Sequence, residues 1–202
     1  MTNFRWPEPI ELKGAKASLV PLSHDHLADL QRASANGALH NLWYTSVPAA
    51  DEMAAEIDRR LALQDAGSML PFTVIDGASG RAVGMTTYMN IEAHNRRLEI
   101  GSTWIQRSVQ RSGLNTTCKF LLLSHAFERL DCIAVEFRTH FLNTQSRTAI
   151  ERLGAKLDGV LRAHMILPNG TLRDTAVYSV TAPDWPAVKA NLTWLMEKPR
   201  DT

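Results

Sequence analysis

The sequence predicts a mixed α/β fold, in which helices flank both faces of a central, mixed but mostly antiparallel, twisted sheet of six to seven strands. The first observation is the order of apolar patterns: strand, two helices, three strands, helix, strand, helix, two strands, helix. The second is a pair of turn segments, at residues 77–80 and 168–170, that join neighbouring strands into antiparallel hairpins. A helix between two strands in the middle of the chain makes those two strands parallel, so the sheet is mixed.

The composition is that of a globular protein, because 202 residues with 45% apolar content suffice for one sizeable core. The 22 basic and 21 acidic residues give a net charge of +1, which argues against a nucleic-acid or membrane partner held by bulk charge. No apolar run is long enough to span a bilayer, and the first residues show no secretory signal pattern. We therefore expect a soluble, cytoplasmic protein, in which Cys118 and Cys132 are buried free thiols.

The first helices follow a short strand over residues 14–22. Ser23 has the position and the side chain of a helix cap, and a second helix is expected over residues 50–66. His24 and His26 resemble a pair of metal ligands, but they begin a helix two positions apart and do not share a face. We expect solvated histidines and no metal site.

Three strands follow over residues 69–76, 81–91 and 96–105, where apolar and polar residues alternate. In the third of them the alternation places Glu99 and Gly101 on the same face. The opposite face then carries Leu98, Ile100 and Trp104.

The second half of the chain begins with the polar segment "SVQRSGLNTTCK", which leads into an amphipathic helix. A strand over residues 132–140 precedes a helix that Asn143 caps and Gly154 ends. Two further strands and a last helix complete the pattern. Four apolar side chains of that last helix are candidates for packing on a partner chain in a homodimer: Trp185, Leu192, Trp194 and Leu195.

The polar segment has the properties of an anion-binding turn. The first N–H groups of a helix have no partner inside it, and the helix dipole makes that end positive. Gly113 permits close approach of a ligand, and Asn115 and Thr116 add donors. The alternative is that Asn115 or Thr116 caps a surface helix. The Walker A loop and the G-x-G-x-x-G fingerprint are both absent from the sequence.

The element order and this turn resemble the GNAT superfamily of acyl-CoA-dependent N-acyltransferases. In that family the pyrophosphate loop reads Q/R-x-x-G-x-G/A, which Gln110 and Gly113 match, whereas Asn115 replaces the last small residue. The segment "NTQSRTAIERLGAKLDGVLR" resembles the N-x-x-S-x-x-x-x-E-x-x-G-[FA]-x-x-x-G block of one branch. The matching residues are Asn143, Ser146, Glu151, Gly154 and Gly159.

That branch contains the acetyltransferases of ribosomal-protein N-termini and of bacterial small-molecule amines. The resemblance covers about residues 15–181, and it implies a GNAT fold in a single domain over residues 1–202 with a C-terminal helical extension over 182–202. It also implies acetyl-CoA as co-substrate and no metal. The residues expected to bind the coenzyme are Trp104, Ile105, Gln106, Gln110, Arg111, Ser112, Gly113, Leu114, Asn115, Thr116 and Asn143.

The reaction implied is attack of a neutral primary amine on the thioester in a ternary complex. Glu99 is the candidate base, and the alternative is a glutamate that is solvated or paired with Arg96 or Arg97. Ser146 is the candidate acid at the leaving thiolate, and the alternative is an ordinary first-turn serine. Tyr178 is the other hydroxyl to consider, although its strand alternation fits a core position equally well.

The acceptor is expected to be a small-molecule amine or a protein N-terminus, with Trp43, Tyr44, Arg162 and His164 lining its site. Two alternatives stay open. One is a non-catalytic GNAT-fold module that binds coenzyme or a protein partner, which Asn115 favours. The other is an acyltransferase with a larger donor such as succinyl-CoA, for which Arg162 or Arg173 would lie near the acyl end.

Overall fold

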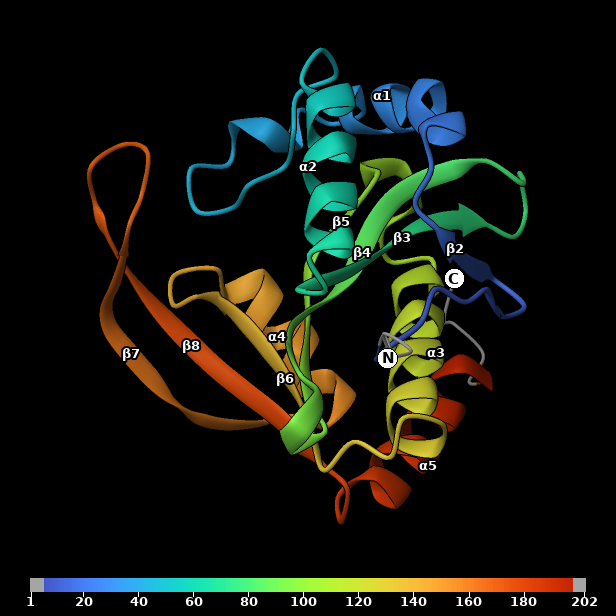
Figure 1. Cartoon of the computed structure of the whole chain (residues 1–202), viewed down its shortest axis with the longest axis vertical. Helices are drawn as coiled ribbons and strands as arrows, with labels where there is room; N and C mark the ends of the chain where they lie inside the picture. Colours follow the sequence, from blue (N-terminus) through green and yellow to red (C-terminus); the bar gives the residue numbers. More distant parts are fainter. Residues whose placement is uncertain (1–5, 198–202) are drawn as a thin grey trace.

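A computed structural model describes residues 6–197 and places eight strands in one sheet, in the order β1-β2-β3-β4-β5-β6-β8-β7 (Figure 1). All neighbouring strands are antiparallel except the pair β5–β6, so the predicted mixed sheet is confirmed. The strands are β1 (Leu12–Lys13), β2 (Ala17–Pro21), β3 (Met69–Asp76), β4 (Ala82–Glu92), β5 (Arg97–Ile105), β6 (Ala134–His140), β7 (Lys156–Ile166) and β8 (Leu172–Thr181). The strand beyond the predicted six to seven is β1, whose two residues are too few to show alternation.

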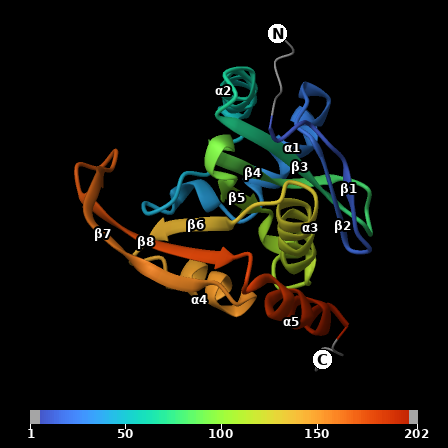
Figure 2. The same ribbon diagram turned by 60° about the horizontal axis from the view of Figure 1, so that its bottom comes forward.

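Helices cover both faces of the sheet, as predicted (Figure 2). One face carries α1 (Leu27–Ala35) and α2 (Met53–Asp65). The other carries α3 (Leu114–Glu128), α4 (Thr144–Leu153) and α5 (Trp185–Glu197). None of the helices within residues 6–197 is long and apolar enough to cross a membrane.

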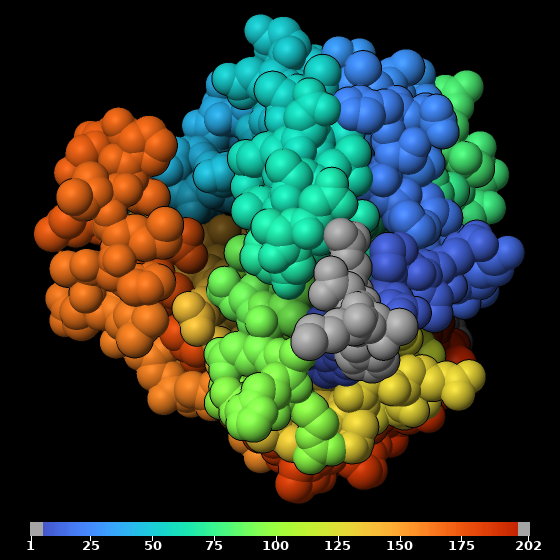
Figure 3. Space-filling view, in the orientation of Figure 1, coloured from blue at the N-terminus to red at the C-terminus, as the bar shows by residue number. Residues whose placement is uncertain are grey.

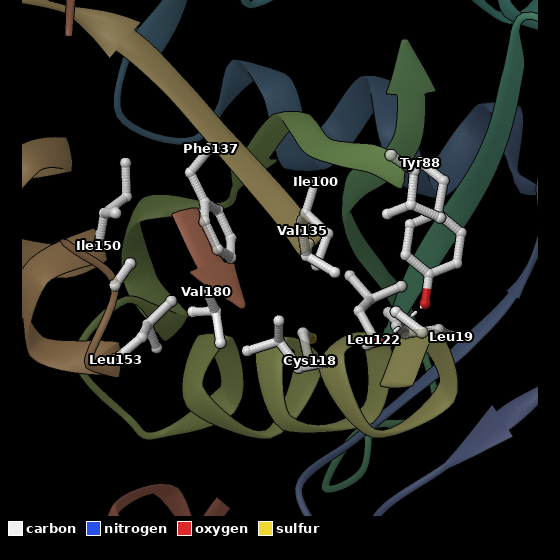
Figure 4. Packing of buried hydrophobic residues seen from close by; sticks show 14 of the residues in the cluster. Leu19, Tyr88, Ile100, Cys118, Leu122, Val135, Phe137, Ile150, Leu153 and Val180 are labelled. Atoms are coloured by element: carbon white, nitrogen blue, oxygen red, sulfur yellow. Dashed lines mark hydrogen bonds between the residues drawn. The ribbon is translucent and has the colours of Figure 1, made fainter. Parts of the chain in front are cut away.

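The larger of two apolar clusters lies between the sheet and α3, and Figure 4 shows its central residues. Leu122 and Cys118 of α3 meet Val135 and Ile100 from the two parallel strands. The Tyr88 hydroxyl donates a hydrogen bond of 2.6 Å to the Leu122 carbonyl, so this buried polar atom is satisfied. Both cysteines are buried and free, which confirms the prediction for them.

One extra residue in β5 changes which face its side chains occupy. The β4–β5 register moves from Thr87↔Gly101 to Met85↔Trp104, and Ser102 adopts a left-handed φ of 45° at this bulge. Because strand side chains alternate, an inserted residue reverses their direction beyond it. Ile100 therefore belongs to the α3 cluster, whereas Trp104 packs on the α1–α2 side, and the prediction that they share a face was wrong.

The bulge is held from the α1–α2 side by a buried arginine of α2. Arg60 is 1% exposed, and its guanidinium donates to the Thr87 hydroxyl at 2.8 Å and, through two nitrogens, to the Ser102 carbonyl at 3.3 Å. Its Nε donates to Glu56 at 2.6 Å. The guanidinium thus neutralises one carboxylate and satisfies the carbonyl that the bulge turns away from the strand ladder.

The expectation that four apolar side chains of the last helix are available to a partner chain was wrong for most of them. Trp185 and Leu192 of α5 are buried within the chain, where Trp185 stacks on Phe127 at 5.2 Å, so they are not free to pack on a partner. Leu195 also packs against this core, while Trp194 is 56% exposed.

His26, just before α1, is not simply solvated, because its Nδ1 lies 2.9 Å from the Thr73 hydroxyl.

Candidate active site

The sheet opens between its two parallel strands. β5 and β6 pair only over Arg97↔Ala134, Leu98↔Val135 and Glu99↔Glu136, although both strands continue beyond these residues. The two backbones therefore separate just after Glu99. Two neighbouring strands of the sheet form this opening. In the chain, α3 follows β5 and α4 follows β6.

Glu99 lies at the start of the opening and is 5% exposed. Asn90 Nδ2 donates to its Oε2 at 2.6 Å, and Arg138 Nε lies 3.6 Å from the same oxygen. A side chain at Gly101 would come within 2.8 Å of Oε1, so this glycine leaves room for the carboxylate. Burial raises the pKa of Glu99 above its ordinary value, while the bond from Asn90 and the charge of Arg138 oppose the rise.

Glu99 is neither solvated nor paired with Arg96 or Arg97, which was the alternative from the sequence. Arg96 pairs with Asp131, and Arg97 pairs with Glu136, so neither of these arginines binds Glu99. The partner Asn90 was missed by sequence reasoning. Asn90 has a left-handed φ of 48° where the β4–β5 register shifts again, and nothing in the alternation of β4 signals this irregularity.

A cavity of about 420 Å³ adjoins the two partners of Glu99. Asn90 and Arg138 line it together with Ser68, Ile91 and Glu92. In Figure 3 the surface is hollowed between α2 and the hairpin of β7 and β8. The cavity therefore reaches both partners of Glu99, while the carboxylate itself lies behind them.

The N-terminus of α3 borders the same opening and has no side-chain cap. Gly113 is the N-cap with φ 93°, and it has no side chain to cap the helix in the way that Asn143 caps α4. The Ser112 hydroxyl accepts only a long hydrogen bond of 3.4 Å from the Leu114 N–H. Asn115 is the second residue of the helix, and its buried Oδ1 has no hydrogen-bond partner among residues 6–197. The alternative that Asn115 caps this helix is wrong, because Gly113 is the N-cap. Thr116 does not cap it either, because its hydroxyl accepts from Arg152 at 3.5 Å.

The turn before α3 is ordered by its own side chains. Gln110 Nε2 donates to the Ile105 carbonyl at 2.8 Å, and the Ser112 hydroxyl donates to the Val109 carbonyl at 2.7 Å. These bonds fix Gly113 and the first N–H groups of α3 at the end of β5. Trp104 and Ile105 are buried on opposite faces of the sheet, so only their backbone can meet a ligand in the opening.

The Asn143 block places its residues at the N-terminus of α4. Asn143 Oδ1 accepts from the Ser146 N–H at 3.0 Å, which confirms the predicted cap. The Tyr178 hydroxyl is engaged on both sides, because it donates to Glu151 at 2.7 Å and accepts from Arg147 at 2.9 Å. Ser146 is therefore the better placed of the two hydroxyls to meet a ligand.

Three of the four candidate acceptor residues gather at the far end of β6. Trp43 packs edge-on against His140 at 5.2 Å, with Tyr44 against Trp43 at 5.6 Å. His164 Nδ1 lies 3.1 Å from the hydroxyl of Thr175, which is the cross-strand neighbour of His140. Arg162 does not join them, since its side chain is 81% exposed and pairs with Asp174 at 2.6 Å.

Lys119 of α3 is buried next to the bulge without a carboxylate partner among the described residues. Its Nζ donates to the Thr103 hydroxyl at 2.8 Å, and burial lowers its pKa to about 8. Below pH 8 the folded and unfolded chains both hold the proton. Between pH 8 and the ordinary lysine value only the unfolded chain holds it, so this group's contribution to stability rises with pH. The change is on the order of 3 kcal/mol.

We expect Lys119→Met to stabilise the protein at pH 7 by about 1–3 kcal/mol, because methionine removes the buried charge at similar volume. Urea unfolding of both proteins from pH 7 to 9 tests this, and the gap between them should narrow as the pH rises. Burial raises the pKa of both cysteines to about 12, which opposes the trend above pH 9. The charge of Lys119 lowers the pKa of Cys118, so the two proteins differ in this opposing contribution and are compared between pH 7 and 9. A constant gap, or a less stable variant at pH 7, would contradict the assignment.

Comparisons with known proteins show the family of the chain and its fold. The profile of the family described as "Acetyltransferase (GNAT) domain" matches residues 17–156. "Putative ribosomal N-acetyltransferase YdaF" of Bacillus subtilis (strain 168) is 31% identical over 110 residues, which cover 54% of this chain. The match spans 59% of the length of that curated relative.

Solved structures show the same fold over nearly the whole chain. A GCN5-related N-acetyltransferase from Brucella melitensis is 31% identical with a TM-score of 0.87, covering 100% of this chain and 94% of that one. Mycobacterium smegmatis RimJ, solved in complex with CoA-disulfide, has a TM-score of 0.77 at 23% identity. The matched region covers 94% of this chain and 95% of RimJ, and it shows that the two proteins share a fold.

Proposed function

Because the chain belongs to the acetyltransferase (GNAT) family, we propose that it transfers an acetyl group from acetyl-CoA to a primary amine, either of a small molecule or of a protein N-terminus. The observation that carries the proposal is the opening between β5 and β6, which has a buried carboxylate at its start and an uncapped helix N-terminus beside it. The relative named as a ribosomal N-acetyltransferase favours a protein N-terminus, which would place the protein in the cytoplasm.

Coenzyme binding rests on the end of β5, the turn that follows it and α3. The N–H groups at Gly113, Leu114, Asn115 and Thr116 suit a pyrophosphate, because backbone donors and the helix dipole act together there. Gln106, Gln110, Arg111 and Ser112 shape that turn, and Asn143 borders the pantetheine arm. The free backbone edge of β5 at Trp104 and Ile105 suits the amide groups of the arm. The fit requires no side chain from Asn115, so its departure from the family pattern leaves the backbone donors in place.

The reaction has three requirements: removal of a proton from the amine, stabilisation of the oxyanion and protonation of the leaving sulfur. Glu99 accepts a proton from the amine, directly or through water, and the amine nitrogen forms a bond to the acyl carbon. The developing oxyanion is stabilised by N–H groups of β5 beyond the bulge. As the bond between carbon and sulfur breaks, the Ser146 hydroxyl passes a proton to the leaving thiolate and takes one from water in the same step, with the N-terminal end of α4 favouring the negative charge.

Acetyl-CoA should raise the melting temperature of the protein. A ligand at 100 times its Kd adds about 2.7 kcal/mol, which corresponds to roughly 5–10 °C for a chain of this length. Differential scanning fluorimetry with acetyl-CoA at millimolar concentration measures it, and ATP serves as the control for a non-specific effect of phosphate. No shift with acetyl-CoA, or an equal shift with ATP, would count against a coenzyme site at α3.

Turnover is tested by release of free coenzyme A thiol in the presence of a panel of small amines and amidated peptides. Binding of acetyl-CoA without release on any amine would favour the non-catalytic module. Release with a peptide amine but not with small amines would favour a protein N-terminus as the acceptor.

A further inference from the structure

An unusual histidine lies at the end of β6. His140 is 3% exposed, and its Nδ1 accepts a hydrogen bond of 3.0 Å from the Leu142 N–H. The neutral ring then carries its proton on Nε2. That nitrogen is buried and has no hydrogen-bond partner among residues 6–197. A buried donor without an acceptor is costly, so its retention points to a ligand.

A cation without a carboxylate partner among residues 6–197 lies close to His140 on the neighbouring strand. Arg173 Nε donates to the Thr175 hydroxyl at 3.0 Å, and Thr175 is paired with His140 in the β6–β8 register. Within the described part of the chain no carboxylate lies within ion-pairing distance of Arg173. Arg173 is half-buried. Its burial lowers the pKa of the guanidinium, and the charge of Glu99 raises it.

The other arginines of this sheet region are already neutralised. Arg138 binds Glu136 at 2.8 Å and approaches Glu99, and Arg162 binds Asp174 in solvent. Side chains at alternate positions of a strand share a face, and cross-strand neighbours share it too. Glu99, His140 and Arg173 therefore lie on one face of the sheet, with about 13 Å along β6 between the levels of Glu99 and His140.

We propose that His140 and Arg173 form a binding site for a carboxylate, carried either by the amine acceptor or by the acyl group of the coenzyme. A guanidinium and an imidazole N–H are complementary to two carboxylate oxygens. The inference rests on the proposed function, because Glu99 defines where the amine and the thioester meet. Trp43, 49% exposed and edge-on to the imidazole at 5.2 Å, is an exposed neighbour of this site.

The two sources of the carboxylate are separated by two pairs of ligands in isothermal titration calorimetry. Succinyl-CoA against acetyl-CoA tests the acyl group. The amidated tripeptides Ala-Glu-Ala and Ala-Gln-Ala test the acceptor, because they differ only by one carboxylate. In one of the two pairs we expect the carboxylate ligand to bind at least about tenfold more tightly.

The preference should disappear in Arg173→Gln and fall in His140→Gln, and it should persist in Arg162→Gln, which removes an exposed arginine of the same hairpin. Arg173→Lys keeps the charge and should retain part of the preference, which separates a lost charge from a misfolded site. Equal binding within both pairs, or a preference unchanged by Arg173→Gln, would overturn the carboxylate site. Acetyl-CoA binding to the wild-type protein is read in the same titrations, so failure of the proposed function is recognised separately.

Discussion

Glu99→Gln should lower kcat/KM by about 10²–10⁴, which is the usual contribution of a positioned general base. Glutamine fills the same volume and accepts the hydrogen bond from Asn90, but it cannot take a proton from the amine. Thiol release with the best amine of the panel measures the loss. Acetyl-CoA affinity should stay within about threefold, because the role proposed for Glu99 is on the amine and not at the α3 turn.

The pH profile gives an independent reading of the same carboxylate. Since the proposed base must be ionised to take a proton, kcat/KM should rise with pH through a pKa above the ordinary glutamate value. Asn90 lowers this pKa, so Asn90→Gly should move the rise to higher pH; glycine tolerates the left-handed backbone at this position. Glu128→Gln, on α3 and paired with Lys189, is the control carboxylate. Full activity of Glu99→Gln, or an unshifted profile in Asn90→Gly, would remove Glu99 as the base.

Arg60→Met should destabilise the protein by about 3 kcal/mol. The change leaves the Ser102 carbonyl and the Thr87 hydroxyl without the guanidinium that now binds them, and Glu56 loses one of its two arginines. Urea unfolding measures the loss. The affinity for acetyl-CoA should fall as well, because the bulge sets the course of β5 along the opening.

Arg59→Met is a matched control for this variant. Arg59 is the adjacent residue of α2 and binds the same carboxylate at 2.7 Å, but its side chain is 52% exposed. An exposed pair of this kind contributes less than about 1 kcal/mol. Equal destabilisation by the two substitutions would show that the ion pair with Glu56, rather than the contact with the bulge, gives Arg60 its effect.

The sequence was most informative where a local pattern decides the structure. The alternation over residues 69–76 predicted β3 with the bounds that the structure has, and Asn143 caps α4 as its side chain and position predicted. Glu99 was placed on the face opposite Leu98 and Ile100, and the structure has it there. In each of these cases the neighbouring residues alone contain the required information.

Features that depend on distant contacts could not be predicted in this way. The residues around Ser102 are small or polar, so they fit either face and conceal the extra residue. Arg60 looks like an exposed residue of an amphipathic helix, because its partners come from two strands far along the chain. His140 likewise alternates as a normal strand residue, and only the β6–β8 register and the position of Trp43 single it out.

The opening between β5 and β6 also bears on how such a protein can evolve. Its walls are main-chain atoms of two strands and the end of a helix, so most side-chain substitutions leave the coenzyme side unchanged. The aromatic pair that faces His140 belongs instead to the connection between α1 and α2, which contains only one short 3-10 turn. Connections of this kind tolerate insertions and replacements far better than strands do. In the proposed function, therefore, ligand preference at the His140 end can diverge among relatives while the main-chain coenzyme site stays the same.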